Sequence, residues 1–234
     1  MNVIVSGLTA AGKTTHCLLL SQRYNLTLIS AASVMAKLSG FEFTADAMES
    51  AFWVSEEAKQ IVALRKKSEQ LDLAVDAVLK RLSEKADNIV FDACGLPWIS
   101  SAPALRIWLE SSLESRLLKS FVSHRLDEYP MSSNLLEFIA RKDQDTRDIF
   151  LSLYSFDIYE DREVFDLVLD ISSLIRRPHI LSAKRSIRIA DEIISSIVGW
   201  RLEGTREHRA IFQKHLAAYG DNMFISYPPD ISQG

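Results

Sequence analysis

The chain has 234 residues, of which 47% are hydrophobic and 25% are charged, and its formal net charge is −4. This composition is typical of a globular protein, and the length allows one sizeable core. An acidic balance of this size predicts no nucleic-acid partner and no anionic-membrane partner, and no apolar run approaches the roughly 18 residues that span a bilayer. Cys17 and Cys94 lie far apart and have no metal-ligand spacing, so we expect a reducing, cytoplasmic setting.

Short apolar runs alternate with longer helical patterns along the chain. The strands are expected at 2–6, 26–30, 88–93, 105–110 and 166–172, and the helices at 13–24, 44–85, 113–126, 135–150 and 182–200. Because the strand candidates are apolar almost throughout, they predict an α/β three-layer sandwich with a five-stranded parallel sheet between helices. Residues 201–234 are more polar than the rest of the chain. Their last part contains proline and shows no periodic pattern of apolar residues. We therefore expect a C-terminal extension that is partly loose.

The first motif is a glycine-rich loop, VSGLTAAGKTTH at residues 5–16. Gly7, Gly12, Lys13 and Thr14 match G-x-x-x-x-G-K-[ST] between a predicted strand and a predicted helix, which is the setting of a phosphate-binding loop. Glycines let backbone N–H groups approach phosphate oxygens, and the helix N-terminus adds the positive end of its dipole. We expect Lys13 to reach the β- and γ-phosphates of a bound nucleotide and Thr14 to ligate Mg²⁺; the resemblance described below makes this nucleotide ATP. The residues expected to contact this donor are Gly7, Leu8, Thr9, Ala10, Ala11, Gly12, Lys13, Thr14 and Thr15.

The segment NIVFDACGLPW ends the third predicted strand on Asp92. A carboxylate at the end of a strand beside the phosphate-binding loop is suited to hold Mg²⁺ or to orient an acceptor hydroxyl, although it could simply cap the strand. Trp98 follows in a loop that would face a ligand in an open α/β sheet, where it could stack on a base or serve packing.

A predicted helix carries Arg141 and Arg147, six residues apart. Phosphoryl transfer requires cations around the oxygens of the transferred group, so these two side chains are candidates for that role. A solvated helix face with alternating charge explains the same spacing. The phosphate-binding loop alone does not distinguish kinases from GTPases or other ATPases.

In the order and spacing of its segments, the sequence resembles the cytidylate kinase family of nucleoside monophosphate kinases, most closely its short prokaryotic members. LTLISAASVMAKL resembles the family's S-A-G-x-x-F-R segment, and LDLAVDAVLKRL resembles its D-x-x-x-D helix. RKDQDTRDIFLSLYSFDI and FDLVLDIS are similar to its lid and last strand. The resemblance implies a P-loop NTPase fold with a helical lid. The implied kinase domain is 1–200, with an acceptor-binding helical region at about 36–85 and a lid at about 127–162.

The resemblance also implies roles for individual residues. Asp92 takes the acidic position beside the acceptor, and Arg141 and Arg147 become lid cations. The residues expected to face the acceptor are Ser30, Asp72, Asp76, Trp98 and Asp166.

Two arginines that grip the acceptor phosphate in the family are replaced here, at Ala36 and at Cys94 or Gly95. Each lost charge-assisted hydrogen bond costs roughly 1.5–3 kcal/mol. Candidates to replace these cations are Lys37, Arg65 and Arg106.

The leading hypothesis is an ATP- and Mg²⁺-dependent kinase for a (d)CMP-like pyrimidine nucleotide, in which Lys13, Asp92, Arg141 and Arg147 are catalytic. The missing arginines favour an alternative, a kinase for a nucleoside or another small-molecule hydroxyl. A third hypothesis is a nucleotide-binding switch or ATPase that acts through residues 201–234. The sequence leaves a dimer open.

Overall fold

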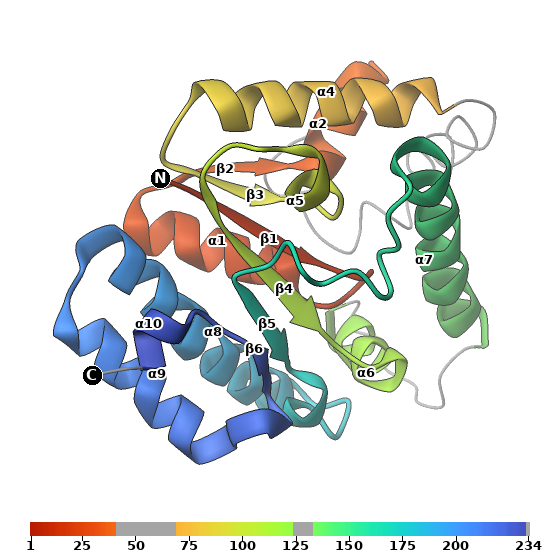
Figure 1. The fold of residues 1–234 in the computed structure, drawn as a ribbon. Helices are drawn as coiled ribbons and strands as arrows, with labels where there is room; N and C mark the ends of the chain where they lie inside the picture. Colours follow the sequence, from red (N-terminus) through yellow and green to blue (C-terminus); the bar gives the residue numbers. More distant parts are fainter. Residues whose placement is uncertain (41–68, 124–132, 233–234) are drawn as a thin grey trace.

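The structure, a computed structural model, describes residues 1–40, 69–123 and 133–232. Its elements up to the fourth strand are β1 (Asn2–Gly7), α1 (Lys13–Tyr24), β2 (Thr27–Ser30), α2 (Ala31–Leu38), α4 (Gln70–Lys85), β3 (Ile89–Asp92), α5 (Leu96–Ile99) and β4 (Ala104–Glu110). The later elements are α6 (Leu113–Ser123), α7 (Ser133–Tyr154), β5 (Leu167–Asp170), η3 (Ser172–Leu174), α8 (Ile180–Glu203), α9 (Arg206–Tyr219), η4 (Gly220–Asn222), β6 (Phe224–Ser226) and α10 (Pro229–Ser232). Figure 1 shows the sheet in the centre of the fold with helices on both of its faces.

The sheet has six strands in the order β2-β3-β1-β4-β5-β6. Strands β1 to β5 are parallel, and β6 pairs antiparallel with β5. Strand β1 therefore lies at the centre, between β3 and β4. This order places the carboxyl ends of β1, β2 and β3 side by side at one edge of the sheet.

Each face of the sheet packs against its own helices. Along β1, Val3 and Val5 belong to a core cluster with α1, α8 and α9, whereas Ile4 belongs to a second cluster with α2, α4 and α5. All six residues of β1 are buried, as expected for a strand covered on both sides. The predicted three-layer α/β sandwich is therefore confirmed.

The sheet has six strands and not the five predicted, and residues 201–232 contribute helices and a strand to the fold. Helix α9 packs on α8, and β6 adds a sixth strand to the sheet. The side chains of Phe212 and Phe224 are fully buried, with their ring centroids 5.3 Å apart. A three-residue strand is too short to show a periodic pattern, and its stability comes from β5 and α9, which sequence periodicity does not reveal.

Two of the predicted helices extend into segments that lie outside the described residues. Of the helix predicted at 44–85, the structure describes α4 from Gln70 onward, and of the one predicted at 113–126 it describes α6 to Ser123. Residues 41–68, with Arg65, and residues 124–132, where the lid was predicted to begin, lie outside the described residues. None of the described helices is long and apolar enough to cross a membrane.

Replacing Phe212 by Ala is expected to lower the free energy of unfolding by about 3–5 kcal/mol, because it opens a cavity in the core shared with α8 and β6. Ile211→Ala on the partly exposed side of the same helix is the control and should cost much less. Urea unfolding measures both variants. Equal and small losses would show that α9 contributes nothing to the core.

Candidate active site

The candidate site lies at the carboxyl edge of the strands. Asp92, the last residue of β3, is opposite Val5 of β1 and opposite Ser30, the last residue of β2. Its buried carboxylate accepts a hydrogen bond from the Thr14 hydroxyl, with an Oγ1–Oδ2 distance of 2.5 Å. The structure therefore brings the predicted metal-binding pair together. Two hard oxygen donors in contact fit Mg²⁺, which is commonly held by one or two protein oxygens together with phosphates and water.

The glycine-rich loop between β1 and α1 has the backbone that phosphate binding requires. Gly7 has a φ of +148°, and a Cβ there would lie 2.7 Å from the carbonyl oxygen of Leu109, so a larger residue does not fit. Gly12 has a φ of +107° and directly precedes the first turn of α1, whose N–H groups it leaves uncovered. The Lys13 ammonium lies over this loop and donates to the carbonyl oxygen of Leu8 at 2.9 Å.

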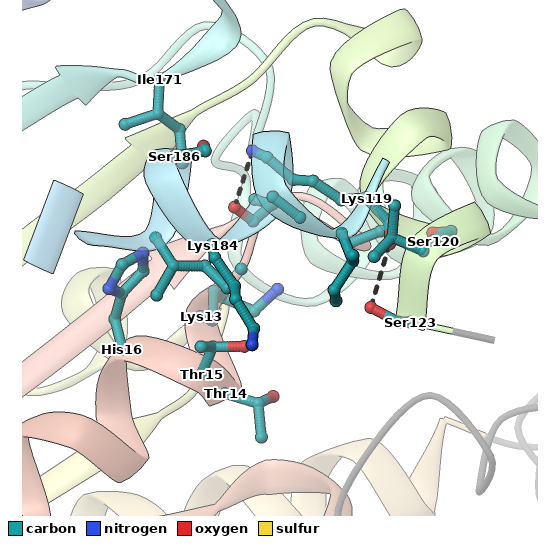
Figure 2. Close-up of a pocket in the computed structure, with 17 residues that line it drawn as sticks. Lys13, Thr14, Thr15, His16, Lys119, Ser120, Ser123, Ile171, Lys184 and Ser186 are labelled. Carbon is teal, nitrogen blue, oxygen red and sulfur yellow. Dashed lines mark hydrogen bonds between the residues drawn. The ribbon is translucent and has the colours of Figure 1, made fainter. Parts of the chain in front are cut away.

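A cavity of about 350 Å³ opens on one side of the loop. Its walls come from the loop and α1, from α6, and from the first turns of α8 (Figure 2). Lys13, Lys119 and Lys184 line it, and no carboxylate is among the described residues that do. The charge of this cavity therefore suits a polyphosphate, and we call it the donor cavity.

A second cavity, of about 220 Å³, opens on the other side of the loop and is called here the acceptor cavity. Three of the residues predicted to face the acceptor, Ser30, Asp72 and Asp76, line it together with Asp92. Both cavities share Ala10, Lys13 and Thr14. Two molecules bound in the two cavities would therefore meet at the Lys13 ammonium and the Thr14 hydroxyl.

The polar groups of the acceptor cavity are held in place by neighbouring elements. The Ser30 hydroxyl caps α2 by accepting from the backbone N–H of Ser33 at 3.0 Å. The Asp76 carboxylate accepts from the Tyr154 hydroxyl of α7 at 2.9 Å, and burial together with this carboxylate raises the pKa of Tyr154. Asp72 lies one helical turn before Asp76 and is buried as well. Helix α7 is thus fixed to α4 across the cavity.

The sequence reasoning missed a buried ion pair that holds the loop. The Arg116 guanidinium of α6 and the Asp143 carboxylate of α7 lie 2.5 Å apart, with side chains 7% and 3% exposed. Asp143 accepts from the backbone N–H of Thr9 at 2.9 Å, and Arg116 donates to the carbonyl oxygen of Thr9 at 2.9 Å. Both polar backbone groups of one loop residue are therefore bound by this pair. Asp143 stands beside Lys142 in the segment RKDQD, but nothing local distinguishes it from Asp145.

Two further basic side chains, His16 and Lys119, lie at the wall of the donor cavity. The Lys119 ammonium donates to the carbonyl oxygen of Ala11 at 3.2 Å and to the hydroxyl of Ser111 at 2.9 Å. Burial, with Arg116 nearby, lowers the pKa of Lys119 to about 7. Burial also lowers the pKa of His16 to about 3, and Lys119 adds to that shift. The imidazole of His16 is therefore neutral near pH 7.

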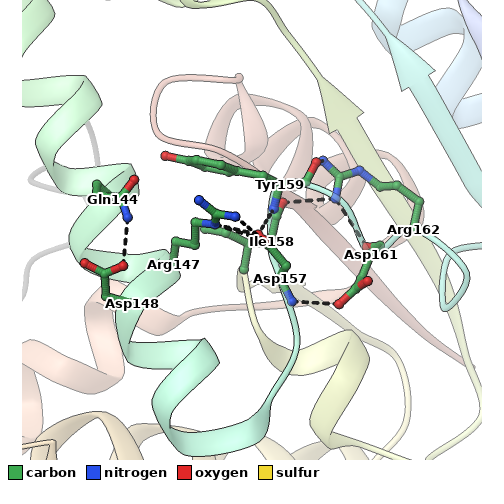
Figure 3. Close-up of polar contacts among 8 residues, drawn as sticks. All are labelled: Gln144, Arg147, Asp148, Asp157, Ile158, Tyr159, Asp161 and Arg162. Atoms are coloured by element: carbon green, nitrogen blue, oxygen red, sulfur yellow. Dashed lines mark hydrogen bonds and ion pairs between the residues drawn. The ribbon is translucent and has the colours of Figure 1, made fainter.

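The two predicted lid arginines line neither cavity. Arg141 is 66% exposed and lies 3.4 Å from Glu137 in a surface pair. Arg147 points to Asp157, in the segment after α7, and binds its carboxylate through two guanidinium nitrogens (Figure 3). Hydrogen bonding from Arg147 lowers the pKa of Asp157, so this pair is charged over a wide pH range. Among the described residues of the segment predicted to form the lid, Lys142 is the cation that lines the acceptor cavity.

Two residues predicted to face the acceptor are placed elsewhere. Trp98 stacks on Phe156 with ring centroids 4.5 Å apart and meets the edges of Trp108 and Phe165, so its packing interpretation is the one the structure favours. Asp166 directly precedes β5, so in a parallel sheet it lies at the amino edge, opposite to Asp92. There its carboxylate accepts from the backbone N–H of Arg106 at 2.8 Å.

The candidates to replace the missing arginines are not at the acceptor cavity either, as far as they are described. Arg106 donates to the carbonyl oxygen of Ser100 at 2.7 Å, and Lys37 is exposed on α2 next to the buried Ala36. Arg65 lies outside the described residues. The cations that line this cavity within the described part of the chain are Lys13 and Lys142.

Comparisons with known proteins agree with this geometry. Residues 2–173 match the model of the cytidylate kinase-like family. The chain belongs to this family. It is 30% identical over 203 residues to a cytidylate kinase of Pyrobaculum islandicum, covering 85% of this chain and 95% of that protein. It is 26% identical over 178 residues to a cytidylate kinase of Sulfurisphaera tokodaii, covering 74% and 88%. The resemblance predicted from the sequence is therefore confirmed.

A solved structure shares the fold. An uncharacterized protein of Eubacterium ventriosum superposes with a TM-score of 0.55 at 11% identity, covering 85% of this chain and 98% of that one. At this identity the likeness concerns the fold alone. Together with the family match, the geometry makes this member of the cytidylate kinase-like family a nucleoside monophosphate kinase-like phosphotransferase.

Arg116→Met is expected to lower the free energy of unfolding by about 3–5 kcal/mol, because it leaves the Asp143 carboxylate buried without its cation. Arg141→Met, which removes the cation of an exposed pair, is the control and should cost about 0–1 kcal/mol. Urea unfolding compares them. Replacing both partners, with Arg116→Met and Asp143→Leu, should recover much of the loss, and no recovery would contradict this account.

The buried neutral His16 predicts acid sensitivity. Its pKa falls from 6.5 in the unfolded chain to about 3 in the fold, so the unfolded chain binds an extra proton between these values. The contribution of neutral His16 to the free energy of unfolding is fully present above pH 6.5 and is lost as the pH falls toward 3. His16→Leu should flatten this part of the profile of unfolding free energy against pH. An unchanged slope in His16→Leu would contradict this account.

Proposed function

We propose that the chain is an ATP- and Mg²⁺-dependent kinase that phosphorylates a CMP-like pyrimidine nucleotide. The observation that carries this proposal is the meeting of the donor and acceptor cavities at Lys13 and Thr14, where the Thr14 hydroxyl is bound to Asp92 of the acceptor cavity. An enzyme that transfers a group directly between two bound molecules needs such a junction. The matching relatives named cytidylate kinases support the nature of the acceptor.

The residues at the junction account for the chemistry. The loop N–H groups and Lys13 would bind the β- and γ-phosphates, and Thr14 and Asp92 would hold Mg²⁺, which neutralises phosphate charge when bound. An acceptor phosphate oxygen would attack the γ-phosphorus in line while the bond to the bridging oxygen of ADP breaks. Because a phosphate acceptor is already ionised, positioning and charge supply the catalysis, and no histidine base is required.

The acceptor cavity favours a second candidate as well. Asp72, Asp76, Asp92 and Asp143 line it, and within the described residues its only cations are Lys13 and Lys142. The Asp92 carboxylate can accept a hydrogen bond from an acceptor hydroxyl, whereas Ala36 and Cys94 or Gly95 stand where the family has arginines for the acceptor phosphate. A nucleoside or another hydroxyl acceptor is therefore the alternative, and Asp92 would then take the hydroxyl proton.

The remaining predictions concern setting and assembly. Cys17 and Cys94 are free thiols, which supports the proposed reducing, cytoplasmic setting. The switch hypothesis receives no support from the C-terminal segment, because α9 and β6 share the core of the kinase fold. The dimer stays a prediction.

ADP release in the presence of Mg²⁺ and ATP tests the proposal across CMP, dCMP, UMP, AMP and cytidine. We expect CMP or dCMP to give the highest kcat/KM. Stimulation by cytidine alone would favour the hydroxyl acceptor, and a rate that no acceptor changes would overturn the kinase function.

Variants test the junction in the same assay. Lys13→Met should lower kcat by about 10²–10³-fold, since it removes a cation from the transferred phosphoryl group. Asp92→Asn should reduce turnover strongly while ATP binding, measured by calorimetry, is retained. Lys80→Met, an exposed site on α4, is the control. Full activity of Lys13→Met would contradict the assignment.

A further inference from the structure

A strongly basic segment joins β5 to α8 and runs into that helix. Residues 171–190 contain Arg176, Arg177, Lys184, Arg185 and Arg188 and no acidic residue, in a chain whose net charge is −4. The segment lies at the edge of the fold, beside α6 (Figure 1). The segment is therefore strongly positive, although the net charge of the whole chain is negative.

Most of these cations have no partner within the part of the chain that the structure describes. Arg188 lies 3.7 Å from Glu192, one helical turn away. The other four, Arg176, Arg177, Lys184 and Arg185, are exposed, and none forms an ion pair with a carboxylate of residues 1–40, 69–123 or 133–232. Unpaired cations that lie close together on a surface repel one another, and a bound anion relieves this repulsion.

Two aliphatic side chains stand among these cations. Ile180 and Leu181, the first residues of α8, are 52% and 67% exposed. Leu181 is the most exposed large hydrophobic side chain of the described residues. We call Arg176, Arg177, Ile180, Leu181, Lys184 and Arg185 the α8 basic surface.

We propose that the α8 basic surface docks on an anionic lipid bilayer. Lysine and arginine side chains are attracted to anionic headgroups, and adjacent exposed aliphatic side chains can insert into the apolar layer beneath them. A nucleic acid would match the charge but offers no apolar phase for Ile180 and Leu181. The combination of exposed cations with the exposed Ile180 and Leu181 therefore favours lipid over nucleic acid.

The docking surface borders the donor cavity, because Ile180 and Lys184 line that cavity as well. The test therefore uses the four members that line neither cavity: Arg176, Arg177, Leu181 and Arg185. Their variants should keep the ADP-release activity of the unmodified chain, which also shows that they fold.

Co-sedimentation with vesicles tests the proposal at low salt. The full chain should bind vesicles made of equal parts phosphatidylcholine and phosphatidylglycerol but not vesicles of phosphatidylcholine alone, and added salt should weaken the binding. The triple variant Arg176→Gln, Arg177→Gln, Arg185→Gln should bind about 100-fold more weakly, since each cation near an anionic surface contributes about fivefold. Leu181→Ser should weaken binding as well.

Matched controls remove the same groups elsewhere on the surface. The triple variant Lys80→Gln, Arg141→Gln, Lys214→Gln removes three exposed cations, and Ile225→Ser removes another exposed aliphatic side chain. Both should bind the anionic vesicles almost as well as the unmodified chain.

Several outcomes would overturn the proposal. Equal binding to both kinds of vesicle, no binding to either, or equal losses in the control variants would each do so. Binding of an oligouridylate that depends on the three arginines but not on Leu181 would assign the surface to nucleic acid. A raised KM for ATP in the arginine variant, with vesicle binding unchanged, would assign these cations to the donor nucleotide.

Discussion

The hydrogen bond between Thr14 and Asp92 is the interaction that ties the phosphate-binding loop to the end of the sheet. It joins the first turn of α1 to the end of β3, and it exists because the parallel pairing of β1 with β3 brings Val5 opposite Asp92. The same pairing brings Ser30 to Asp92 from the other side. A buried carboxylate is tolerated only where donors satisfy it, so this edge of the sheet is suited to a hydroxyl now and to a bound cation during catalysis.

The loop divides the site into two compartments of different charge. Lysines line the donor cavity, whereas aspartates dominate the acceptor cavity, and Lys13 belongs to both. The two compartments therefore differ in the charged side chains that they offer to a ligand. The buried pair of Arg116 and Asp143 fixes Thr9 between the compartments and ties α6 and α7 to the loop. Movement of α7 would therefore act directly on the phosphate-binding backbone.

The limits of sequence reasoning follow from the range of the interactions involved. Lys13, Thr14 and Asp92 were predictable because each sits at a fixed place relative to a recognisable strand or helix. Arg116 and Asp143 are 27 residues apart and belong to different helices, so no local pattern joins them. Arg147 was predicted to bind the transferred phosphate, whereas its partner in the structure, Asp157, lies beyond the end of its helix, where helical spacing does not reveal it. Strand β6 escaped prediction because its three residues depend on β5 for pairing.

Predictions from the net charge are limited in a similar way. A net charge of −4 predicts no polyanionic partner, yet residues 171–190 hold five cations without an acid. In salt near physiological strength the field of an exposed charge decays over about 8 Å, which is much less than the width of a domain of this size. Acidic residues on a distant face therefore cannot cancel the field at the start of α8. Because binding depends on the potential where contact occurs, the distribution of charge, and not its sum, decides which face of this protein attracts an anion.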